Sequence, residues 1–192
     1  ALFVYSRPDH VKKTVNALKR NKEASDTDLI IFSDGPKIPD HVHLVSEVRN
    51  YIADIEGFKT IKIIQRPHNY GLARSIISGV SDVLKQYDRI IVLEDDLVTS
   101  KNFLNFMNSG LSIYRDEDKV ISIHGYSYPT NRKLPETYFL RGADCWGWAR
   151  WRRGWEHFEP NGEFLLNELN NKGLIKKFDL DGNFEFSQML RD

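Results

Sequence analysis

Three consecutive acids, Glu94, Asp95 and Asp96, follow directly on the apolar run Ile90–Leu93. Neighbouring carboxylates repel one another by about 1 kcal/mol per pair even in water, and by more where water is excluded. Oxygen ligands of this kind suit a hard divalent cation such as Mg²⁺ or Mn²⁺, completed by phosphates and water. Alternation along a strand would place Glu94 and Asp96 on one side and Asp95 on the other. We interpret the acids as a candidate cation site; the alternative is a solvated strand-to-helix turn.

Arg74 adds a possible partner for that site. It lies in the first turn of a predicted helix that begins near Gly71. A cation there faces the positive end of the helix dipole, at a cost of about 0.3–1 kcal/mol. An anion, either the acids or a bound phosphate, would offset this cost; the alternative is that Arg74 points into solvent. The sequence has neither a G-x-x-x-x-G-K-[ST] loop nor a G-x-G-x-x-G turn, so a bound diphosphate would need a metal to carry much of its charge.

All four tryptophans fall in one stretch, DCWGWARWRRGWEHF. Trp148, Trp151 and Trp155 follow one another at helical spacing, which predicts Trp151 and Trp155 in the core. Trp146 and Trp148 flank Gly147, a residue that lets another group approach the backbone closely. An indole ring against the apolar face of a sugar is a suitable use for this pair, with core packing as the alternative.

The elements that must position these residues alternate along the first half of the chain. Apolar runs predict strands, and i, i+3, i+4 patterns between them predict helices. The strands are expected at residues 2–5, 29–32, 60–65, 90–94 and 120–123, and the helical stripes at 11–18, 45–55, 72–83 and 103–111. This alternation predicts an α/β fold with an open, mostly parallel Rossmann-like sheet and helices on both faces. From about Tyr126 the chain is rich in aromatic residues, and we expect a more irregular and helical C-terminal part.

Ligands of open parallel sheets bind outside the carboxyl ends of the strands. The segments that follow the first four predicted strands are polar in every case. They are Ser6-Arg7, residues 33–36, residues 66–71 and Glu94–Asp96. We therefore expect these segments to converge on one crevice.

Composition excludes several classes of protein. Lysine plus arginine and aspartate plus glutamate number 27 each, so no overall field attracts nucleic acid or an anionic membrane. The single cysteine, Cys145, rules out an internal disulfide and fits a reducing compartment. No apolar run approaches the roughly 20 residues that span a bilayer. We expect neither a nucleic acid partner nor a transmembrane segment in this chain.

Taken together, these motifs resemble the nucleotide-sugar-dependent glycosyltransferases of the GT-A fold. The resemblance is closest to bacterial family-2-like sugar transferases and to the N-acetylglucosaminyltransferase I type. It rests on FVYSRPDHVKKTVNAL, IIFSDGP, NYGLARSI, IIVLEDDL and CWGWARWRRGW, which extend from residue 2 to about residue 155. The EDDL segment is similar to the Asp-x-Asp metal motif of that group.

The resemblance implies a GT-A fold and an activity. The enzyme would move a hexose or N-acetylhexosamine from a nucleoside-diphosphate sugar, with a UDP-sugar favoured, to a hydroxyl of a glycan or other acceptor. It would invert the anomeric centre and use Mn²⁺ or Mg²⁺. Residues 1–125 would form the nucleotide-sugar-binding half and residues 126–192 an incomplete acceptor-side region of one continuous domain, truncated at both ends. A cytoplasmic location in a bacterium is expected, with peripheral membrane attachment through other parts of the protein left open.

The resemblance also implies roles for single residues. Asp96 would be the direct metal ligand. Ser6 and Arg7 would lie along the nucleotide, and Asp34 would contact the base or ribose. The remaining residues expected to contact the nucleotide or donor sugar are Asn69, Arg74, Glu94, Asp95, Trp146, Gly147 and Trp148, with the WGW segment as the wall of the sugar site.

The general base is the least defined of these roles. In the resembling enzymes it is an acid downstream of the WGW segment, next to a tryptophan. The downstream acids here are Asp179, Asp181 and Glu185, and none has a tryptophan beside it. Glu185, between Phe184 and Phe186, is the candidate; the alternative is a base beyond Asp192.

Two other functional classes compete with this interpretation. One is a non-catalytic nucleotide- or carbohydrate-binding domain derived from such an enzyme, which would bind nucleotide with metal yet show no turnover. The other is a different metal-dependent α/β enzyme, for instance a phosphatase, which needs a nucleophilic aspartate at the end of the first strand. Tyr5, Ser6 and Arg7 occupy that place, which disfavours the phosphatase.

Overall fold

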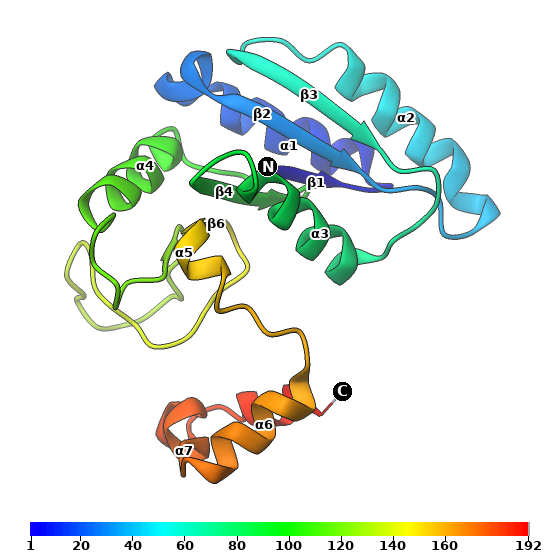
Figure 1. The fold of residues 1–192 in the computed structure, drawn as a ribbon. Coiled ribbons are helices and arrows are strands. Elements are labelled where there is room, and N and C mark those ends of the chain that lie inside the picture. The colour runs from blue at the N-terminus through cyan, green and yellow to red at the C-terminus, as the bar shows by residue number, and fades with distance from the viewer. Residues whose placement is uncertain (192) are drawn as a thin grey trace. The chain divides into compact units, whose positions relative to one another are not determined.

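A computed structural model describes residues 1–191 of the chain (Figure 1). These residues form two compact units. The larger unit contains residues 1–127 and 144–155, and the smaller contains residues 128–143 and the described part of residues 156–192. The predicted functional division, between a nucleotide-sugar-binding half at residues 1–125 and an acceptor-side region at residues 126–192, is not tested by these units and stays a prediction.

The larger unit is built on a six-stranded sheet with the order β3-β2-β1-β4-β6-β5. The strands are β1 (Leu2–Val4), β2 (Asp28–Ser33), β3 (Thr60–Gln65), β4 (Arg89–Glu94), β5 (Ser122–His124) and β6 (Trp148–Trp151). Strand β1 pairs in parallel with β2 and β4, and β2 pairs in parallel with β3. Strand β6 runs antiparallel to β4 and β5. The mostly parallel α/β fold predicted from the sequence is confirmed.

Helices cover both faces of this sheet. The four predicted helical stretches are α1 (Pro8–Lys19), α2 (Val42–Ala53), α3 (Leu72–Leu84) and α4 (Phe103–Ile113). Figure 1 shows α1 and α2 behind the sheet and α3 in front of it. Side-chain alternation explains the two layers: Leu2 and Val4 pack into the apolar cluster with α1, α2 and α4, whereas Phe3 packs into the cluster with α3.

The tryptophan segment corrects part of the sequence-based prediction. The helical spacing of Trp148 and Trp151 does not produce a helix, because β4 and β5 supply antiparallel partners on both sides of this segment. Trp148 and Trp151 consequently face opposite sides of the sheet. Trp151 is 4% exposed and lies in the core, as predicted. Trp155 ends the short helix α5 (Arg152–Trp155), and its ring stacks on Trp148 at a centroid distance of 6.2 Å.

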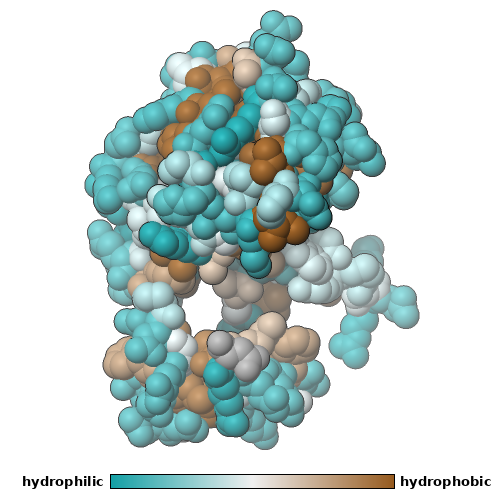
Figure 2. Space-filling view, turned by 90° about the vertical axis from the view of Figure 1, so that its right-hand side faces the viewer, coloured by the Kyte–Doolittle hydropathy of each residue, from teal (hydrophilic) through white to brown (hydrophobic). Residues whose placement is uncertain are grey.

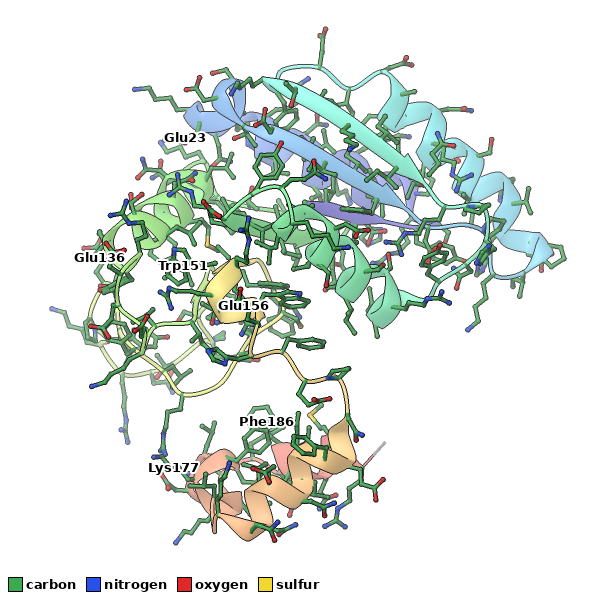
Figure 3. All side chains as sticks on the ribbon, viewed as in Figure 1. Glu23, Glu136, Trp151, Glu156, Lys177 and Phe186 are labelled. Atoms are coloured by element: carbon green, nitrogen blue, oxygen red, sulfur yellow. The ribbon has the colours of Figure 1, made fainter. Side chains whose placement is uncertain are left out.

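The smaller unit is irregular and helical, as expected. It contains α6 (Gly162–Asn171), α7 (Ile175–Phe178) and short 3₁₀ turns η3 (Leu180–Gly182) and η4 (Phe186–Leu190). The ring of Phe186 meets Phe178 and Phe184 at centroid distances of 6.3 and 4.3 Å (Figure 3). Apolar side chains also reach the surface of this unit, which shows brown patches among hydrophilic residues (Figure 2). Among the described residues, no helix combines the length and apolar character needed to cross a membrane.

Candidate functional site

The strand order reverses beside β1, and this reversal places the candidate site. The chain passes from β1 to β2 and β3 on one side and then returns to β4 on the other side of β1. At such a switch point the neighbouring loops diverge and leave a crevice at the carboxyl ends of the strands. Strand β1 ends at Val4 and β4 ends at Glu94. The loops that begin at Tyr5 and Asp95 therefore enter the crevice together, as the sequence predicted.

Arg7 joins these two loops by ion pairs to two acids. One arm of its guanidinium, Nη2, pairs with Asp95, and Nη1 donates to Asp96 at 3.0 Å. The Asp95 side chain is 3% exposed and also accepts a hydrogen bond from the N–H of Tyr5 at 3.3 Å. The Thr14 hydroxyl donates to the Asp95 carbonyl at 2.8 Å. Asp95 is thus turned inward and fixed, whereas the Asp96 side chain is 40% exposed.

The acids at the end of β4 outnumber the arginine that is paired with them. Glu94, Asp95 and Asp96 face the single guanidinium of Arg7. Burial raises the pKa of Glu94, and the charges of Asp96 and Asp95 raise it further. Burial also raises the pKa of Asp95, against the opposing effect of Arg7. A cation placed among these acids would therefore relieve repulsion that one arginine leaves in place.

The protein groups fit a cation that brings ligands of its own. Within residues 1–191, no cluster of three or more histidine, cysteine, aspartate or glutamate side chains forms a complete metal site. Asp96 offers an exposed carboxylate at the crevice. Mg²⁺ and similar ions are commonly held by one or two carboxylates together with substrate phosphates and water. Asp96 is thus suitably placed to hold a cation that arrives with a diphosphate.

Asp34 connects the loops that follow β2 and β3. It is 5% exposed, and its carboxylate accepts hydrogen bonds from the N–H groups of Gly35, Tyr70 and Gly71 at 3.0, 2.9 and 3.1 Å. The Asn69 side chain donates to the Gly35 carbonyl at 2.9 Å. The structure therefore brings Asp34 and Asn69 together within one pair of loops. Their predicted contacts with nucleotide remain predictions.

The close approach of these loops requires Gly35. A Cβ atom at this position would lie 2.5 Å from the carbonyl carbon of His68. Such a contact is too short for any side chain, and the neighbouring atoms belong to backbone that cannot rotate away. Gly35 therefore sets how near the two loops can lie.

Arg49 is a residue of this region that sequence reasoning missed. It extends from α2, where its Nη2 donates to the carbonyl oxygens of Arg66 and Asp34 at 2.7 and 3.3 Å. Its Nε donates to the Ser33 hydroxyl at 3.2 Å. These bonds hold the ends of β2 and β3 together. Nothing in the spacing of α2 marks Arg49, because its partners are backbone groups on other elements.

Arg66 was also missed, although it opens the polar segment after β3. It is 6% exposed, and burial lowers its pKa. Its Nη2 donates to the Ser75 carbonyl at 3.0 Å, while its Nη1 is buried without a hydrogen-bond partner. The guanidinium carbons of Arg66 and Arg74 lie 4.3 and 4.6 Å from the centre of the Tyr70 ring. Arg74 itself is exposed at the first turn of α3, so this loop presents positive charge at the crevice.

The WGW segment lies next to the acids and uses its two tryptophans differently. Trp148 pairs with Val92, which places this segment beside β4. Burial raises the pKa of Cys145, and the negative charge of Glu94 raises it further. Trp146 is 44% exposed and meets the Tyr126 ring edge-on at 4.7 Å. Trp148 is partly buried in the second apolar cluster. Gly147 has a φ of +77°, a conformation that favours glycine.

The two remaining predicted site residues, Ser6 and Glu185, lie in different units. Ser6 lies partly buried between β1 and α1, in the same loop as Arg7. Glu185 belongs to the smaller unit, where it is exposed and accepts a hydrogen bond from the Gln188 side chain at 2.6 Å. Its catalytic role stays a prediction.

A cavity of about 480 Å³ opens at the opposite, amino ends of the strands. Its lining includes Leu29 of β2 and Arg89 and Ile90 of β4. Because the polar loops all follow the carboxyl ends, this cavity is not part of the candidate site.

The family described as "Glycosyl transferase family 2" matches residues 2–164. Curated protein sequences gave no match. Among solved structures, the crystal structure of S. aureus TarS 1–349 is similar, with 15% sequence identity and a TM-score of 0.44. That match covers 78% of this chain and 46% of the other, so the chain spans less than half of that protein's length.

Proposed function

Because this chain belongs to glycosyl transferase family 2, we propose that it binds a nucleoside-diphosphate sugar at the crevice between β1 and β4 and transfers the sugar to an acceptor hydroxyl. A uridine diphosphate sugar is the favoured donor. The observation that carries the proposal is the arrangement of Arg7, Asp95 and Asp96 at the switch point, where one exposed carboxylate faces the place that ligands occupy in such sheets.

In this proposal several charged residues together neutralise the negative charge of the diphosphate. Asp96 holds a divalent cation, Mn²⁺ or Mg²⁺, which stabilises the departing diphosphate when it is bound. Arg7 and Arg74 supply positive charge from two sides of the crevice. Asp34 and Asn69 shape the loop against which the nucleoside binds.

The WGW segment forms the wall for the sugar. Trp146 supports this role because nearly half of its surface is exposed, and an indole ring packs well on the apolar face of a hexose or N-acetylhexosamine. Gly147 gives the segment its turn, because its φ of +77° favours glycine, and the Phe103 ring packs against it at the place of a side chain. Trp148 holds the segment in place from the core side.

Transfer proceeds by inversion. The acceptor oxygen attacks the anomeric carbon from the side opposite the diphosphate, and the bond between that carbon and the diphosphate oxygen breaks. The acceptor proton passes to a general base, for which Glu185 is the candidate within the chain.

A thermal-shift panel tests this function. The chain is heated with different nucleoside diphosphates, each with and without Mn²⁺, and then with UDP-glucose and UDP-N-acetylglucosamine. We expect the largest rise in melting temperature with uridine diphosphate and Mn²⁺ together. No rise with any nucleotide would contradict the proposal, whereas binding without transfer to any acceptor would favour the non-catalytic alternative.

A further inference from the structure

Arg7 makes two contacts of unequal character. Its Nη2 pairs with Asp95, whose side chain is 3% exposed and is fixed by the Tyr5 N–H. Its Nη1 pairs with Asp96, whose side chain is 40% exposed. The two contacts use different nitrogen atoms of the guanidinium. Arg7 can therefore release Asp96 and still remain bound to Asp95.

The energetic cost of these two separations differs. Breaking the pair with Asp95 would leave a buried carboxylate without its counter-ion, which is strongly unfavourable. Breaking the pair with Asp96 exposes both groups to water, which solvates them well. The Asp96 contact is thus the one that can open.

We propose that Arg7 competes with the divalent cation for Asp96. This inference rests on the proposed function, because it concerns the same carboxylate. In the ligand-free protein the guanidinium occupies the carboxylate that the cation needs, and its positive charge repels the cation. A diphosphate offers anionic oxygens that a guanidinium binds in a bidentate manner, so its arrival draws Nη1 away from Asp96. Cation and nucleotide should consequently bind cooperatively, each raising the affinity for the other by the same factor.

Arg7→Lys is the informative variant. The lysine ammonium is a compact charge on one nitrogen, so it cannot place separate nitrogen atoms against the two carboxylates as the planar guanidinium does. It should stay with the buried Asp95 and leave Asp96 open to the cation. Arg7→Ala would instead leave Asp95 unpaired, so its melting temperature must be compared with that of Arg7→Lys before its binding is interpreted.

The protein is titrated with Mn²⁺ alone, and binding is monitored by the paramagnetic resonance signal of free Mn²⁺ or by calorimetry. The same titration is then repeated with uridine diphosphate present. We expect Arg7→Lys to lower the dissociation constant for Mn²⁺ alone by about two- to fivefold, the change that an exposed ion pair is worth. The nucleotide should then raise Mn²⁺ affinity by a smaller factor than in the unmodified protein. Adding Asp96→Asn should abolish the gain.

Arg115→Lys is the matched control. Arg115 pairs with Asp116 at 3.0 Å, and both side chains are exposed. This variant should leave Mn²⁺ binding unchanged. If the unmodified protein shows Mn²⁺ binding that depends on nucleotide while Arg7→Lys binds Mn²⁺ alone no better, the competition is overturned and the proposed function stands. If the unmodified protein binds Mn²⁺ neither alone nor with nucleotide, the proposed function fails and this inference fails with it.

Discussion

At the scale of single residues, exposure separates the acids of the crevice into two kinds. Asp95 and Asp34 are buried and accept hydrogen bonds from backbone N–H groups. The Asp96 side chain is 40% exposed and is paired with the long side chain of Arg7. Buried acids of this type hold loops in place, and their loss lowers stability. An exposed acid can be removed with little structural cost and remains accessible to a ligand.

Asp96→Asn tests the cation site directly. We expect the variant to lose the Mn²⁺-dependent rise in melting temperature with uridine diphosphate, because a neutral amide is a poor ligand for a hard cation. The melting temperature without ligand should stay close to the original, since the exposed pair with Arg7 is worth about 0–1 kcal/mol and repulsion among the acids is relieved.

Asp116→Asn provides the control for that experiment, because Asp116 also forms an exposed pair with an arginine. It should change neither measurement. A variant of Asp96 that melts much lower without ligand, yet keeps its response to Mn²⁺ and nucleotide, would show that Asp96 is structural.

Asp34→Ala should affect stability and binding together. Removing the carboxylate leaves the N–H groups of Tyr70 and Gly71 without their acceptor, and an unsatisfied buried group costs about 1–3 kcal/mol. We expect a lower free energy of unfolding in urea and weaker nucleotide binding, because the loop after β3 is released. An unchanged free energy of unfolding would mean that water satisfies these groups equally well.

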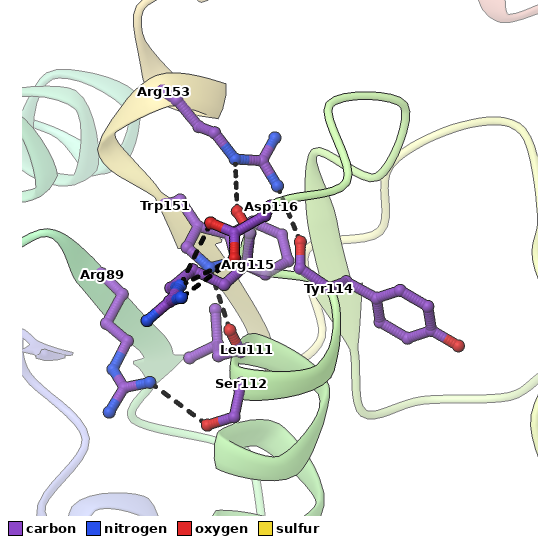
Figure 4. Close-up of polar contacts among 8 residues, drawn as sticks. All are labelled: Arg89, Leu111, Ser112, Tyr114, Arg115, Asp116, Trp151 and Arg153. Carbon is purple, nitrogen blue, oxygen red and sulfur yellow. Dashed lines mark hydrogen bonds and ion pairs between the residues drawn. The ribbon is translucent and has the colours of Figure 1, made fainter.

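At the scale of elements, one segment clamps the end of α4 (Figure 4). The Arg153 guanidinium donates to the carbonyl oxygens of Tyr114 and Arg115 at 3.0 and 3.1 Å, and to those of Glu117 and Val120. It also lies 4.5 Å from the Trp151 ring, whose Nε1 donates to the Leu111 carbonyl. Tyr114 is the C-cap of α4, and the other carbonyl groups that Arg153 contacts belong to the loop that follows it; a cation just beyond the C-terminus of a helix is favourable. The basic run after the WGW segment therefore anchors it to α4.

Arg153→Ala should destabilise the larger unit by about 1–3 kcal/mol, because several carbonyl groups lose a charged donor. Urea unfolding measures this change. Arg115→Ala is the control: Arg115 pairs with the exposed Asp116, and its loss should leave the unfolding midpoint unchanged. Equal effects of the two substitutions would contradict a clamp at Arg153.

His124 on β5 gives this region a defined response to pH. Its Nε2 lies 2.7 Å from the Ser122 hydroxyl, and burial lowers its pKa below the ordinary value of 6.5. The unfolded chain therefore binds more protons than the folded protein when the pH falls below that value, so stability is lost as the pH falls through this window.

His124→Gln should flatten the dependence of melting temperature on pH below about 6.5. His10→Gln, at an exposed position on α1, is the control and should leave the slope unchanged. If His124→Gln keeps the original slope, another group is responsible for the acid sensitivity.

At the scale of the whole molecule, donor and acceptor functions fall to different parts of the chain in our proposal. The larger unit carries the crevice with Arg7 and Asp96, and the smaller unit carries Glu185. Glu185 is exposed, and its hydrogen bond with Gln188 would survive in glutamine. Its substitution therefore separates catalysis from folding.

Glu185→Gln should reduce sugar transfer by about 10²–10⁴-fold, the usual loss on removal of a general base, while nucleotide binding and melting temperature stay unchanged. Transfer is measured with a UDP-sugar and a hydroxyl acceptor. Glu163→Gln, at an exposed acid on α6 of the same unit, is the control. Full transfer by Glu185→Gln would assign the base to another residue.

The sequence alone determined the alternating strands and helices of the larger unit. These elements can be predicted because their sequence patterns are local. The apolar residues of β3 (Thr60–Gln65) and the polar residues that flank them predict both ends of this strand. The sequence also predicted that the segments holding Arg7 and Asp96 converge, because the carboxyl ends of parallel strands share one edge. The ion pair between these two residues is a finding of the tertiary structure.

Only the tertiary structure decided how the remaining residues are used. Trp148–Trp151 forms a strand because β4 and β5, distant in sequence, supply its hydrogen-bond partners, and these override the helical spacing of its tryptophans. Asp34 and Arg49 bind backbone groups of other elements, which have no sequence signature. A hydrogen bond between a side chain and the backbone of another element forms only when the fold brings the two together. No local pattern of side chains predicts which distant backbone groups will be the partners.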